Sequence, residues 1–519
     1  MSPPEDNSQF HYGMNRKPKI CFFLQRSYAF TGHALAVWLQ EKYGVTEFCS
    51  YTGVRRMHEF LKSQKDILYT ELLLDEDVHN RYKNEKLDLS YLRALEKEYG
   101  IPNLWPYLTV DREIMSNQAA REYPYNTPRY THDEMLRILQ VTAKAVIDFL
   151  DREKPDVAVF SVIGAVPSLL LYHIAKKRGI RIAHILTVSL KDRFAVSERY
   201  DVFTDAEKIF AQNLANNRKG RYYDEAKKVV RHFRETPHPY DPKRSAAGQP
   251  IHRGKQLRFL WPANFLRSLR WFVKMLYLYM TGNAREDYTT VSPWNYAKDH
   301  TKRKLRNLVG VSDLYDTYLP NEPHAFFALG YEPEMSLSLL APFADQLYLI
   351  RQTARSLPVG WKLYVKEHPE MVPYRPRSYY KELKKIPNVR LMSPSIDGTT
   401  LAANANLIVT VTGSAAWEGV LLGKPSIVFG NRFFNILSMV KKCAEIENLP
   451  YLVKEQIEDF HYNEEELLQF IAAILEDSAS LKFIELWEQE YDSVKKKEGL
   501  EPLADLIAKK IGLAATSAS

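Results

Sequence analysis

The chain has 519 residues, of which 45% are hydrophobic, and this is enough apolar sequence for two or three domains with substantial cores. Lysine and arginine outnumber aspartate and glutamate by 71 to 63, which gives a formal net charge of +8 spread over a long chain. This bias favours anionic partners without choosing among them. The sequence has no compact basic and aromatic module and no zinc-finger spacing, so we do not expect it to bind nucleic acid.

The cysteines and the N-terminus indicate a cytoplasmic protein. Cys21, Cys49 and Cys443 are odd in number, widely separated and set in mostly apolar sequence, which is typical of reduced core thiols rather than disulfides. The first 19 residues are polar and lack the apolar stretch of a secretion signal. We therefore expect the protein to remain in the cytoplasm.

Strands and helices alternate in two stretches of the N-terminal part. Each stretch reads as a strand, a helix and a strand, at residues 19–24, 31–44, 45–50, 156–164, 167–179 and 180–187. Such alternation implies a parallel sheet flanked by helices. Residues 52–150 carry helical patterns, for example at 131–153. We expect a Rossmann-like domain at 1–203.

Charged helical sequence follows this domain and leads to a basic amphipathic segment at 257–280. Arg267, Arg270 and Lys274 interrupt its apolar run, so the segment is too charged to span a membrane. The three basic residues recur three and four positions apart, beside an aromatic and aliphatic surface, and such a helix can lie on an anionic membrane. A helix packed between domains has the same pattern.

We prefer the packing interpretation and treat peripheral contact with the inner membrane as optional. Residues 204–318 are expected to form a helical insertion or linker that contains this segment.

The alternation resumes around Asn321. The expected strands and helices lie at residues 324–329, 343–358, 361–368, 388–393, 405–411, 414–423 and 426–430. They predict a second Rossmann-like domain at 319–455, followed by C-terminal helices at 456–519. Two Rossmann-like domains joined through a helical middle form an α/β fold of GT-B type, with a ligand cleft between the domains.

Ionisable residues follow the expected strand at 361–368. Lys366 and His368 would lie at its carboxyl end, where open α/β proteins bind ligands, and Pro369 would end the strand. Lysine and histidine there suit an anionic group such as a diphosphate, the lysine through its fixed charge and the histidine as a hydrogen-bond donor or proton carrier, so we also take His368 as a catalytic candidate. The alternative is a solvated Lys366–Glu367 pair with His368 capping a backbone carbonyl.

A hydroxyl-rich turn follows the expected strand at 405–411. Thr412, Gly413 and Ser414 precede a short helix, whose free N-terminal amides attract anions. Glu418 lies one turn into this helix, so its carboxylate can accept hydrogen bonds from ribose hydroxyls at the turn. The alternative is that Ser414 caps the helix and Glu418 favours its positive end.

Residues that could act as a base are less clearly marked. Glu332 and Glu334 follow the strand at 324–329, where they could bind sugar hydroxyls or supply a catalytic carboxylate. We take Glu332 as the catalytic candidate. The alternative is that both are ordinary turn residues around Pro333. Weaker candidates on the N-terminal side are His33, Ser161 and the run 191–193. The acidic run 75–77 is expected to be solvated surface, and no metal is required.

The C-terminal domain resembles the bacterial capsule polysaccharide biosynthesis family. The resemblance rests on "ALGYEPEMS" (328–336), "PFADQLYLI" (342–350), "LPVGWKLYVKEHP" (357–369), "YYKELKKIPNVRLMSP" (379–394), "TVTGSAAWEGVLLGKPSIVFGNRFF" (410–434) and the upstream "PSLLLYHIAKKRGI" (167–180). It covers about half of the chain and little of the helical middle or the tail.

The resemblance implies a GT-B glycosyltransferase of capsule or surface-polysaccharide synthesis, in which residues 1–203 form the acceptor-side domain and residues 319–455 form the nucleotide-sugar-binding domain. The resemblance also implies that His368 and Pro369 contact the donor phosphate, and that the Thr412–Ser414 turn and Glu418 complete the donor site. This chain departs from the family at Ala416, where the turn often carries another glycine. The expected partners are a nucleotide-sugar substrate and a glycan or lipid-linked glycan acceptor, with no separate cofactor. The alternatives are a non-catalytic component of polysaccharide assembly, transport or export, and a nucleotide-sugar epimerase.

Overall fold

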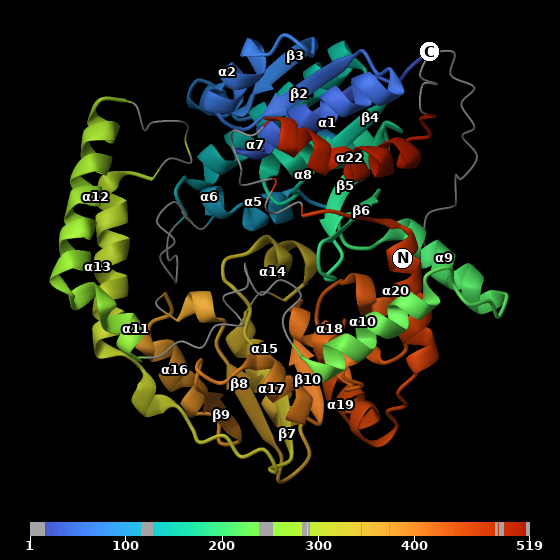
Figure 1. Cartoon of the computed structure of the whole chain (residues 1–519). Coiled ribbons are helices and arrows are strands. Elements are labelled where there is room, and N and C mark those ends of the chain that lie inside the picture. The colour runs from blue at the N-terminus through green and yellow to red at the C-terminus, as the bar shows by residue number, and fades with distance from the viewer. Residues whose placement is uncertain are drawn as a thin grey trace.

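The computed structural model describes residues 16–115, 128–237, 253–282, 288, 291–343, 345–372, 374–482, 486 and 493–514. The chain forms two α/β domains stacked one above the other, each built on its own sheet (Figure 1). Within the described residues, no helix combines the length and apolarity needed to cross a bilayer. The three cysteines are free and buried, as expected.

The N-terminal sheet has seven strands in the order β13-β6-β5-β4-β1-β2-β3. β1 to β5 run parallel, whereas β6 and β13 pair antiparallel at one edge. The strands are Ile20–Leu24 (β1), Phe48–Thr52 (β2), Tyr69–Leu74 (β3), Val157–Phe160 (β4), Arg181–Thr187 (β5), Arg193–Ser197 (β6) and Ser478–Ser480 (β13). β1 is buried along its whole length, which follows from helices covering both faces of a parallel sheet.

Helices cover both faces of this sheet. α7 and α8 pack on one face, and α1 and α22 on the other. The helices of this domain are Tyr28–Tyr43 (α1), Arg55–Ser63 (α2), Asp75–Asn80 (α3), Leu89–Tyr99 (α4), Trp105–Val110 (α5), Arg112–Met115 (α6), His132–Glu153 (α7), Val166–Lys177 (α8) and Ser493–Lys510 (α22). α1 ends at Gly44, whose φ of 68° is the left-handed conformation that glycine adopts without strain.

The C-terminal sheet has six strands, all parallel, in the order β12-β11-β10-β7-β8-β9. They are His324–Ala328 (β7), Lys362–Lys366 (β8), Val389–Met392 (β9), Leu407–Thr410 (β10), Ser426–Val428 (β11) and Val440–Lys442 (β12). The helices are Met335–Leu340 (α14), Gln346–Ser356 (α15), Arg377–Lys384 (α16), Gly398–Asn404 (α17), Ser414–Leu421 (α18), Leu449–Glu458 (α19) and Glu464–Glu476 (α20). The expected α/β class with two Rossmann-like domains of GT-B type is therefore confirmed.

The helical middle divides into two parts that lie on different sides of the molecule (Figure 1). α9 and α10 pack against α20, so they join the body of the protein. α12 and α13 form a hairpin that stands beside the body. These helices are Thr204–Ala215 (α9), Tyr223–Glu235 (α10), Arg253–Leu257 (α11), Pro262–Met280 (α12) and Pro293–Val309 (α13).

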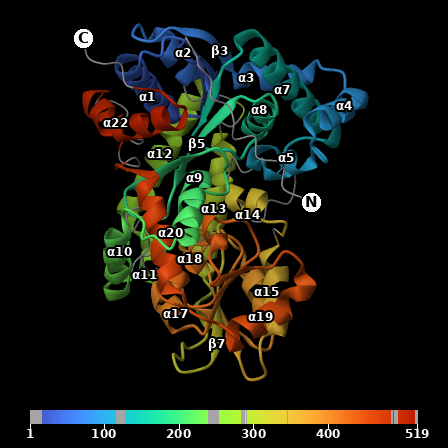
Figure 2. The same ribbon diagram turned by 90° about the vertical axis from the view of Figure 1, so that its right-hand side faces the viewer.

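The C-terminal segment returns to the N-terminal domain. β13 pairs with β6, and α22 packs along α1 (Figure 2). Lys42 on α1 contacts Asp505 on α22 at 2.8 Å. The segment expected as separate C-terminal helices at 456–519 thus completes the first sheet and one of its helical layers, a long-range pairing that its local sequence pattern does not encode.

Candidate functional site

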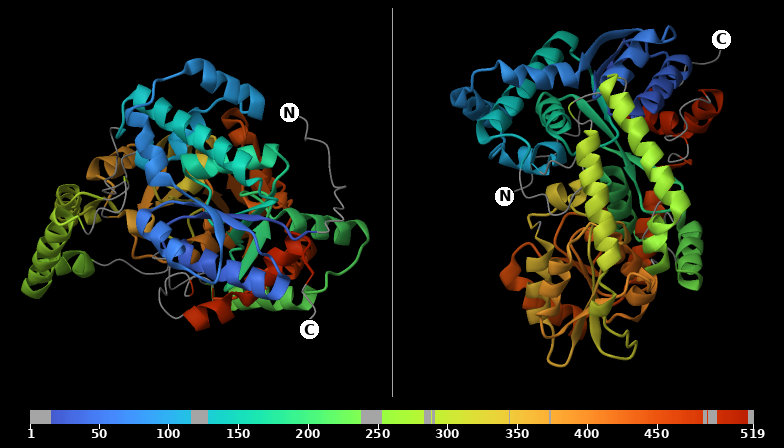
Figure 3. Two further views of the ribbon diagram at one scale, coloured as in Figure 1. Left: turned by 90° about the horizontal axis from the view of Figure 1, so that it is seen from above. Right: turned by 90° about the vertical axis from the view of Figure 1, so that its left-hand side faces the viewer.

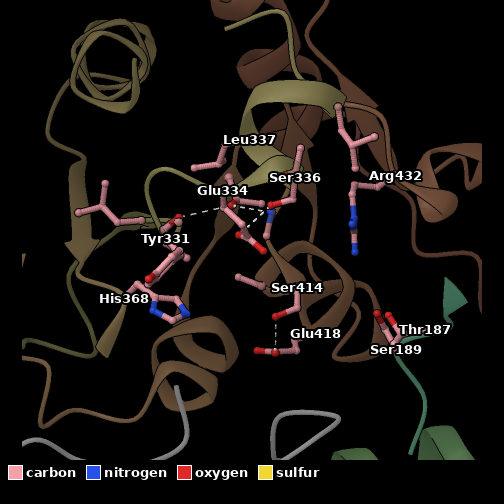
Figure 4. A pocket seen from close by; sticks show the side chains of 18 of the residues that line it. Thr187, Ser189, Tyr331, Glu334, Ser336, Leu337, His368, Ser414, Glu418 and Arg432 are labelled. Carbon is pink, nitrogen blue, oxygen red and sulfur yellow. Dashed lines mark hydrogen bonds between the residues drawn. The ribbon is translucent and has the colours of Figure 1, made fainter. Parts of the chain in front are cut away.

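A cavity of about 700 Å³ lies between the two domains, at the carboxyl ends of strands from both sheets (Figure 4). This volume is in the range of small-molecule sites. From the C-terminal domain it is lined by Lys366, His368, Pro369, Thr412, Gly413, Ser414 and Glu418, all of them site residues predicted from the sequence. The Lys-Glu-His-Pro corner and the Thr-Gly-Ser turn therefore open onto one interdomain space.

Lys366 is the last residue of β8 and is a buried cation. Its side chain makes no hydrogen bond or ion pair with any described residue. Burial lowers the pKa of Lys366, and the negative charges of Asp397, Glu367 and Glu418 oppose this shift only in part. A buried, unpaired ammonium group is costly unless a ligand neutralises it. Lys366 is therefore poised for an anion.

His368 adjoins Lys366 and begins a short turn of 3-10 helix at Pro369–Met371. Its Nδ1 accepts a hydrogen bond from the backbone N–H of Glu370 at 3.3 Å, so it caps an N–H and not the carbonyl that we considered. Burial, with the nearby charges of Lys366 and Arg375, lowers the pKa of His368 to about 4. The ring is thus neutral at pH 7 and keeps its proton on Nε2, which makes His368 a hydrogen-bond donor to the cavity.

A buried ion-pair network supports this corner from behind. Arg375 contacts Glu367 at 2.6 Å from Nε to Oε2, and neither side chain is exposed. Tyr380 donates from its hydroxyl to Glu367 at 3.0 Å. Burial raises the pKa of Glu367, while Arg375 opposes that shift. Glu367 is thus a structural member of the corner rather than half of a solvated pair with Lys366.

Glu332 belongs to the same network, and this corrects its predicted catalytic role. Arg375 donates to Glu332 at 3.0 Å, and Gln346 donates to its other carboxylate oxygen. Glu332 does not line the cavity. The two acids flank Pro333, and the structure turns the first toward Arg375 and only the second, Glu334, toward the cavity.

Glu334 is one of the carboxylates that line the cavity, and it lies beside the predicted donor site (Figure 4). The hydroxyl of Ser336 donates to its Oε2 at 2.8 Å. Burial raises the pKa of Glu334, and the hydrogen bond from Ser336 and the nearby Arg432 partly oppose the shift. A carboxylate with a raised pKa in a cleft is a candidate general base or nucleophile.

The turn before α18 is shaped for close approach to a ligand. The N–H of Gly413 donates to the Thr410 hydroxyl at 3.2 Å, and a Cβ at Gly413 would lie only 2.6 Å from that hydroxyl oxygen. Ser414 donates from its hydroxyl to Glu418 at 3.1 Å and does not cap the helix, because Gly413 holds the N-cap position. The first amides of α18 are left for a ligand at the cavity.

The N-terminal domain contributes a wall that the sequence reasoning missed. Arg112, His184, Thr187, Ser189 and Asp201 line the cavity opposite the strand ends of the C-terminal sheet. Thr187 ends β5, so the strand-end rule that found Lys366 could have found it as well. Arg112 begins the short helix α6, His184 lies inside β5, and Ser189 and Asp201 lie in loops. The local sequence at these positions does not predict a binding site.

The weaker candidates lie away from this cavity. His33 is buried in α1, where its ring nitrogens contact the Tyr69 hydroxyl at 3.1 Å and Asp66 at 3.2 Å. Ser161 and the run 191–193 do not line it either. The expectation for 75–77 was wrong for its first residue, because Asp75 is buried and accepts a hydrogen bond from Tyr51 at 2.7 Å. Across the described residues, no cluster of potential metal ligands is found.

Comparisons with known proteins agree with the resemblance noted in the sequence. The model of a family described as "Capsule polysaccharide biosynthesis protein" matches residues 341–448. Capsule polysaccharide modification protein LipA of Neisseria meningitidis serogroup B is 23% identical over 137 residues, which are 26% of this chain and 20% of LipA. The chain thus matches about a fifth of the length of that relative.

Solved structures of two kinds are also similar. The beta Kdo 2,4 transferase of Thermosulfurimonas dismutans KpsC is 14% identical with a TM-score of 0.37, over 64% of this chain and 83% of that one. The UDP-GlcNAc 2-epimerase of Neisseria meningitidis is 12% identical with a TM-score of 0.28, over 95% of this chain and 100% of that one. The family match, which spans Lys366, His368 and the turn at Thr412–Ser414, confirms the resemblance to the capsule polysaccharide biosynthesis family.

Proposed function

We propose that the protein is a glycosyltransferase of capsule or surface-polysaccharide synthesis, which moves a sugar from a nucleotide donor to a glycan or lipid-linked glycan. One observation carries the proposal. A buried lysine without a partner among the described residues, a neutral histidine and the start of α18 line a single cavity between two Rossmann-like domains. A diphosphate satisfies all three groups at once.

The donor diphosphate would bind at the carboxyl end of β8. Lys366 supplies the positive charge, and His368 donates a hydrogen bond from Nε2. The first backbone amides of α18, which follow the Thr412–Ser414 turn, donate further hydrogen bonds. Negative charge grows on the leaving phosphate as the glycosidic bond breaks. Donors fixed in place before the reaction stabilise that charge by about 2–4 kcal/mol each.

The nucleoside would lie along α18. Glu418 accepts a hydrogen bond from Ser414 and lines the cavity, and a carboxylate at this position suits the hydroxyls of a ribose. Thr412 and Ser414 offer two further hydroxyls at the same turn. We assign these residues to donor binding and not to the chemical step.

Glu334 is the residue that we propose for the chemical step. As a base, its carboxylate takes the proton of the acceptor hydroxyl while that oxygen bonds to the anomeric carbon. The bond from that carbon to the donor phosphate breaks, and the phosphate leaves with the electron pair. A raised pKa suits this role because it makes the carboxylate a better proton acceptor.

Donor binding tests the proposal. Thermal-shift screening against CMP-, UDP- and GDP-sugars should show a clear preference for one of them, and an assay with that donor should yield a glycosylated acceptor only when acceptor is present. Conversion of the free nucleotide sugar without acceptor would instead show an epimerase. Glycan binding that needs no nucleotide and survives His368→Ala would instead show a non-catalytic assembly or export component.

A further inference from the structure

The helical hairpin of α12 and α13 carries an exposed surface that the cavity does not explain. The two helices run side by side and stand off the body of the protein (Figure 3). One face of α12 packs on α13, as shown by Trp271 against Tyr296 at 4.7 Å between ring centroids. The structure therefore does not show the packing between domains that we preferred for this segment, because the inner face of α12 packs on α13 of the same hairpin.

The outer face of α12 is apolar along its length. At 100° per residue, Phe265, Leu266, Leu269, Val273, Leu276, Tyr277 and Met280 fall within one sector of about 120°. All seven are large hydrophobic residues, and all except Leu276 are at least half exposed, with Met280 75% exposed. We call these seven residues the apolar stripe.

The apolar stripe continues onto neighbouring elements. Trp294 on α13 contacts Phe272 of α12 at 6.3 Å between ring centroids, and Phe272 lies on the helical wheel directly beside Phe265. Leu260 and Trp261, just before α12, are also exposed. Single exposed hydrophobic residues are common, but a contiguous surface of this kind marks an interaction site.

A row of cations borders the apolar stripe on α12. Arg270, Lys274 and Arg267 fall at successive angles next to Tyr277 on the helical wheel. All three are exposed, and none of them pairs with a carboxylate in the described part of the chain. The sequence from 242 to 285 contains no aspartate or glutamate. Among the described residues, no carboxylate therefore neutralises this basic row.

We propose that this face of α12 docks on an anionic lipid bilayer. An apolar stripe beside a basic row is the arrangement of helices that lie in the membrane interface, with the apolar residues among the acyl chains and the cations at the headgroups. A nucleic acid would neutralise the basic row but leave the apolar stripe in water. A second copy of the chain would cover the apolar stripe but bring two basic rows together.

The hairpin is tied to the cavity, so docking sets the position of the cavity above the lipid. Arg303 on α13 donates to the Tyr374 hydroxyl at 2.9 Å, and Arg306 donates to the Tyr374 backbone carbonyl. Tyr374 directly precedes Arg375, whose ion pair with Glu367 supports His368. The docking proposal stands without the proposed transferase activity, but it would present the cavity to an acceptor anchored in the same bilayer.

Sedimentation of the full chain with vesicles tests the proposal. The wild type should bind phosphatidylglycerol vesicles and not phosphatidylcholine vesicles, and added salt should weaken the binding. The triple change Arg267→Gln, Arg270→Gln and Lys274→Gln should weaken binding on the order of a hundred-fold, since each cation near an anionic surface contributes several-fold. The pair Leu269→Ser and Val273→Ser should weaken it at least about ten-fold through lost apolar burial.

A matched control removes the same charge elsewhere. Lys62, Lys227 and Lys454 are exposed on α2, α10 and α19, and their joint change to Gln should leave vesicle binding near that of the wild type. All variants should keep the wild-type thermal midpoint because the altered residues are exposed. The proposal is overturned if the wild type does not bind anionic vesicles, if the control loses as much binding as the α12 triple, or if the serine pair only dissolves a dimer.

Discussion

Glu367 and Arg375 form an ion pair that is closed to solvent, with 2.6 Å between Oε2 and Nε and no exposure of either side chain. The pair lies directly behind His368 and holds the strand end that faces the cavity. Breaking a buried pair leaves an uncompensated charge, which costs more than an exposed pair contributes.

Arg375→Leu should therefore lower the free energy of unfolding by about 3–5 kcal/mol, measured by urea denaturation. The matched control is Arg377→Leu, two residues later, whose partner Asp313 is exposed. That control should unfold near the wild-type midpoint. Equal losses in the two variants would show that the buried network does not stabilise the corner.

Lys366→Met should separate a ligand-binding role from a structural one. The substitution removes a buried cation without a partner among the described residues, so the apo protein should become more stable, on the order of 1 kcal/mol. Affinity for the nucleotide donor should fall about ten- to a hundred-fold, since one charge-assisted hydrogen bond is lost. Calorimetric titration and urea unfolding of the same samples measure both.

The control is Lys362→Met, at the other end of β8 and away from the cavity. It should leave donor affinity unchanged. A loss of stability in Lys366→Met with donor affinity intact would assign Lys366 to the fold alone.

Glu334→Gln should reduce turnover by about a hundred-fold or more while donor affinity stays close to that of the wild type, because a general base acts in the chemical step. The matched variant is Glu332→Gln, which alters the Arg375 network and should lower stability more than turnover. Steady-state kinetics with saturating donor, beside thermal melts, distinguish the two. The opposite pattern would return the catalytic role to Glu332.

His368 gives a pH dependence of stability. Its pKa is about 4 in the folded protein, below the ordinary 6.5, so between these values the unfolded chain binds the extra proton. The free energy of unfolding should thus fall as the pH is lowered from 6.5 towards 4. In His368→Gln this part of the loss, about 1–2 kcal/mol after allowance for solvent, should be absent.

The difference between the wild type and His368→Gln isolates this residue, since His184 and His300, with pKa values lowered to about 3 and 4, titrate in both proteins. A difference that does not change with pH would mean that His368 titrates normally.

Gly413→Ala should impair both the fold and the site. The added Cβ would meet the Thr410 hydroxyl at 2.6 Å, so the turn before α18 must shift. We expect a lower thermal midpoint and at least about ten-fold weaker donor binding. Gly398→Ala, at a cavity residue where a Cβ meets nothing within 4 Å, should change neither quantity, and a similar effect of both variants would contradict this account.

The sequence was sufficient for what depends on local pattern. The end of a buried strand is recognisable in the sequence because its apolar run stops, and parallel strands bring their carboxyl ends to one edge of the sheet. The sequence therefore predicts that Lys366, His368 and the turn at Gly413 lie close together, and all three line the cavity. The sequence does not show which of Glu332 and Glu334 faces the cavity. This depends on which of them Arg375 contacts, and Arg375 is more than forty residues away in sequence.

The sequence also does not predict which elements pair when they are far apart along the chain. β13 and α22 complete a domain that begins more than four hundred residues earlier, and no periodicity identifies β6 or α1 as their partner. The segment at α12 shows the same limit, because an amphipathic pattern does not reveal whether its apolar face is covered.

The strongest test of anion binding at Lys366 is calorimetric titration of the wild type with nucleoside diphosphates and nucleotide sugars, with Lys366→Met and Lys362→Met titrated in parallel. We expect saturable binding of one nucleotide class to the wild type and to Lys362→Met, and an affinity lower by about ten- to a hundred-fold in Lys366→Met. Equal affinity in all three proteins, or no binding to any, would contradict this expectation.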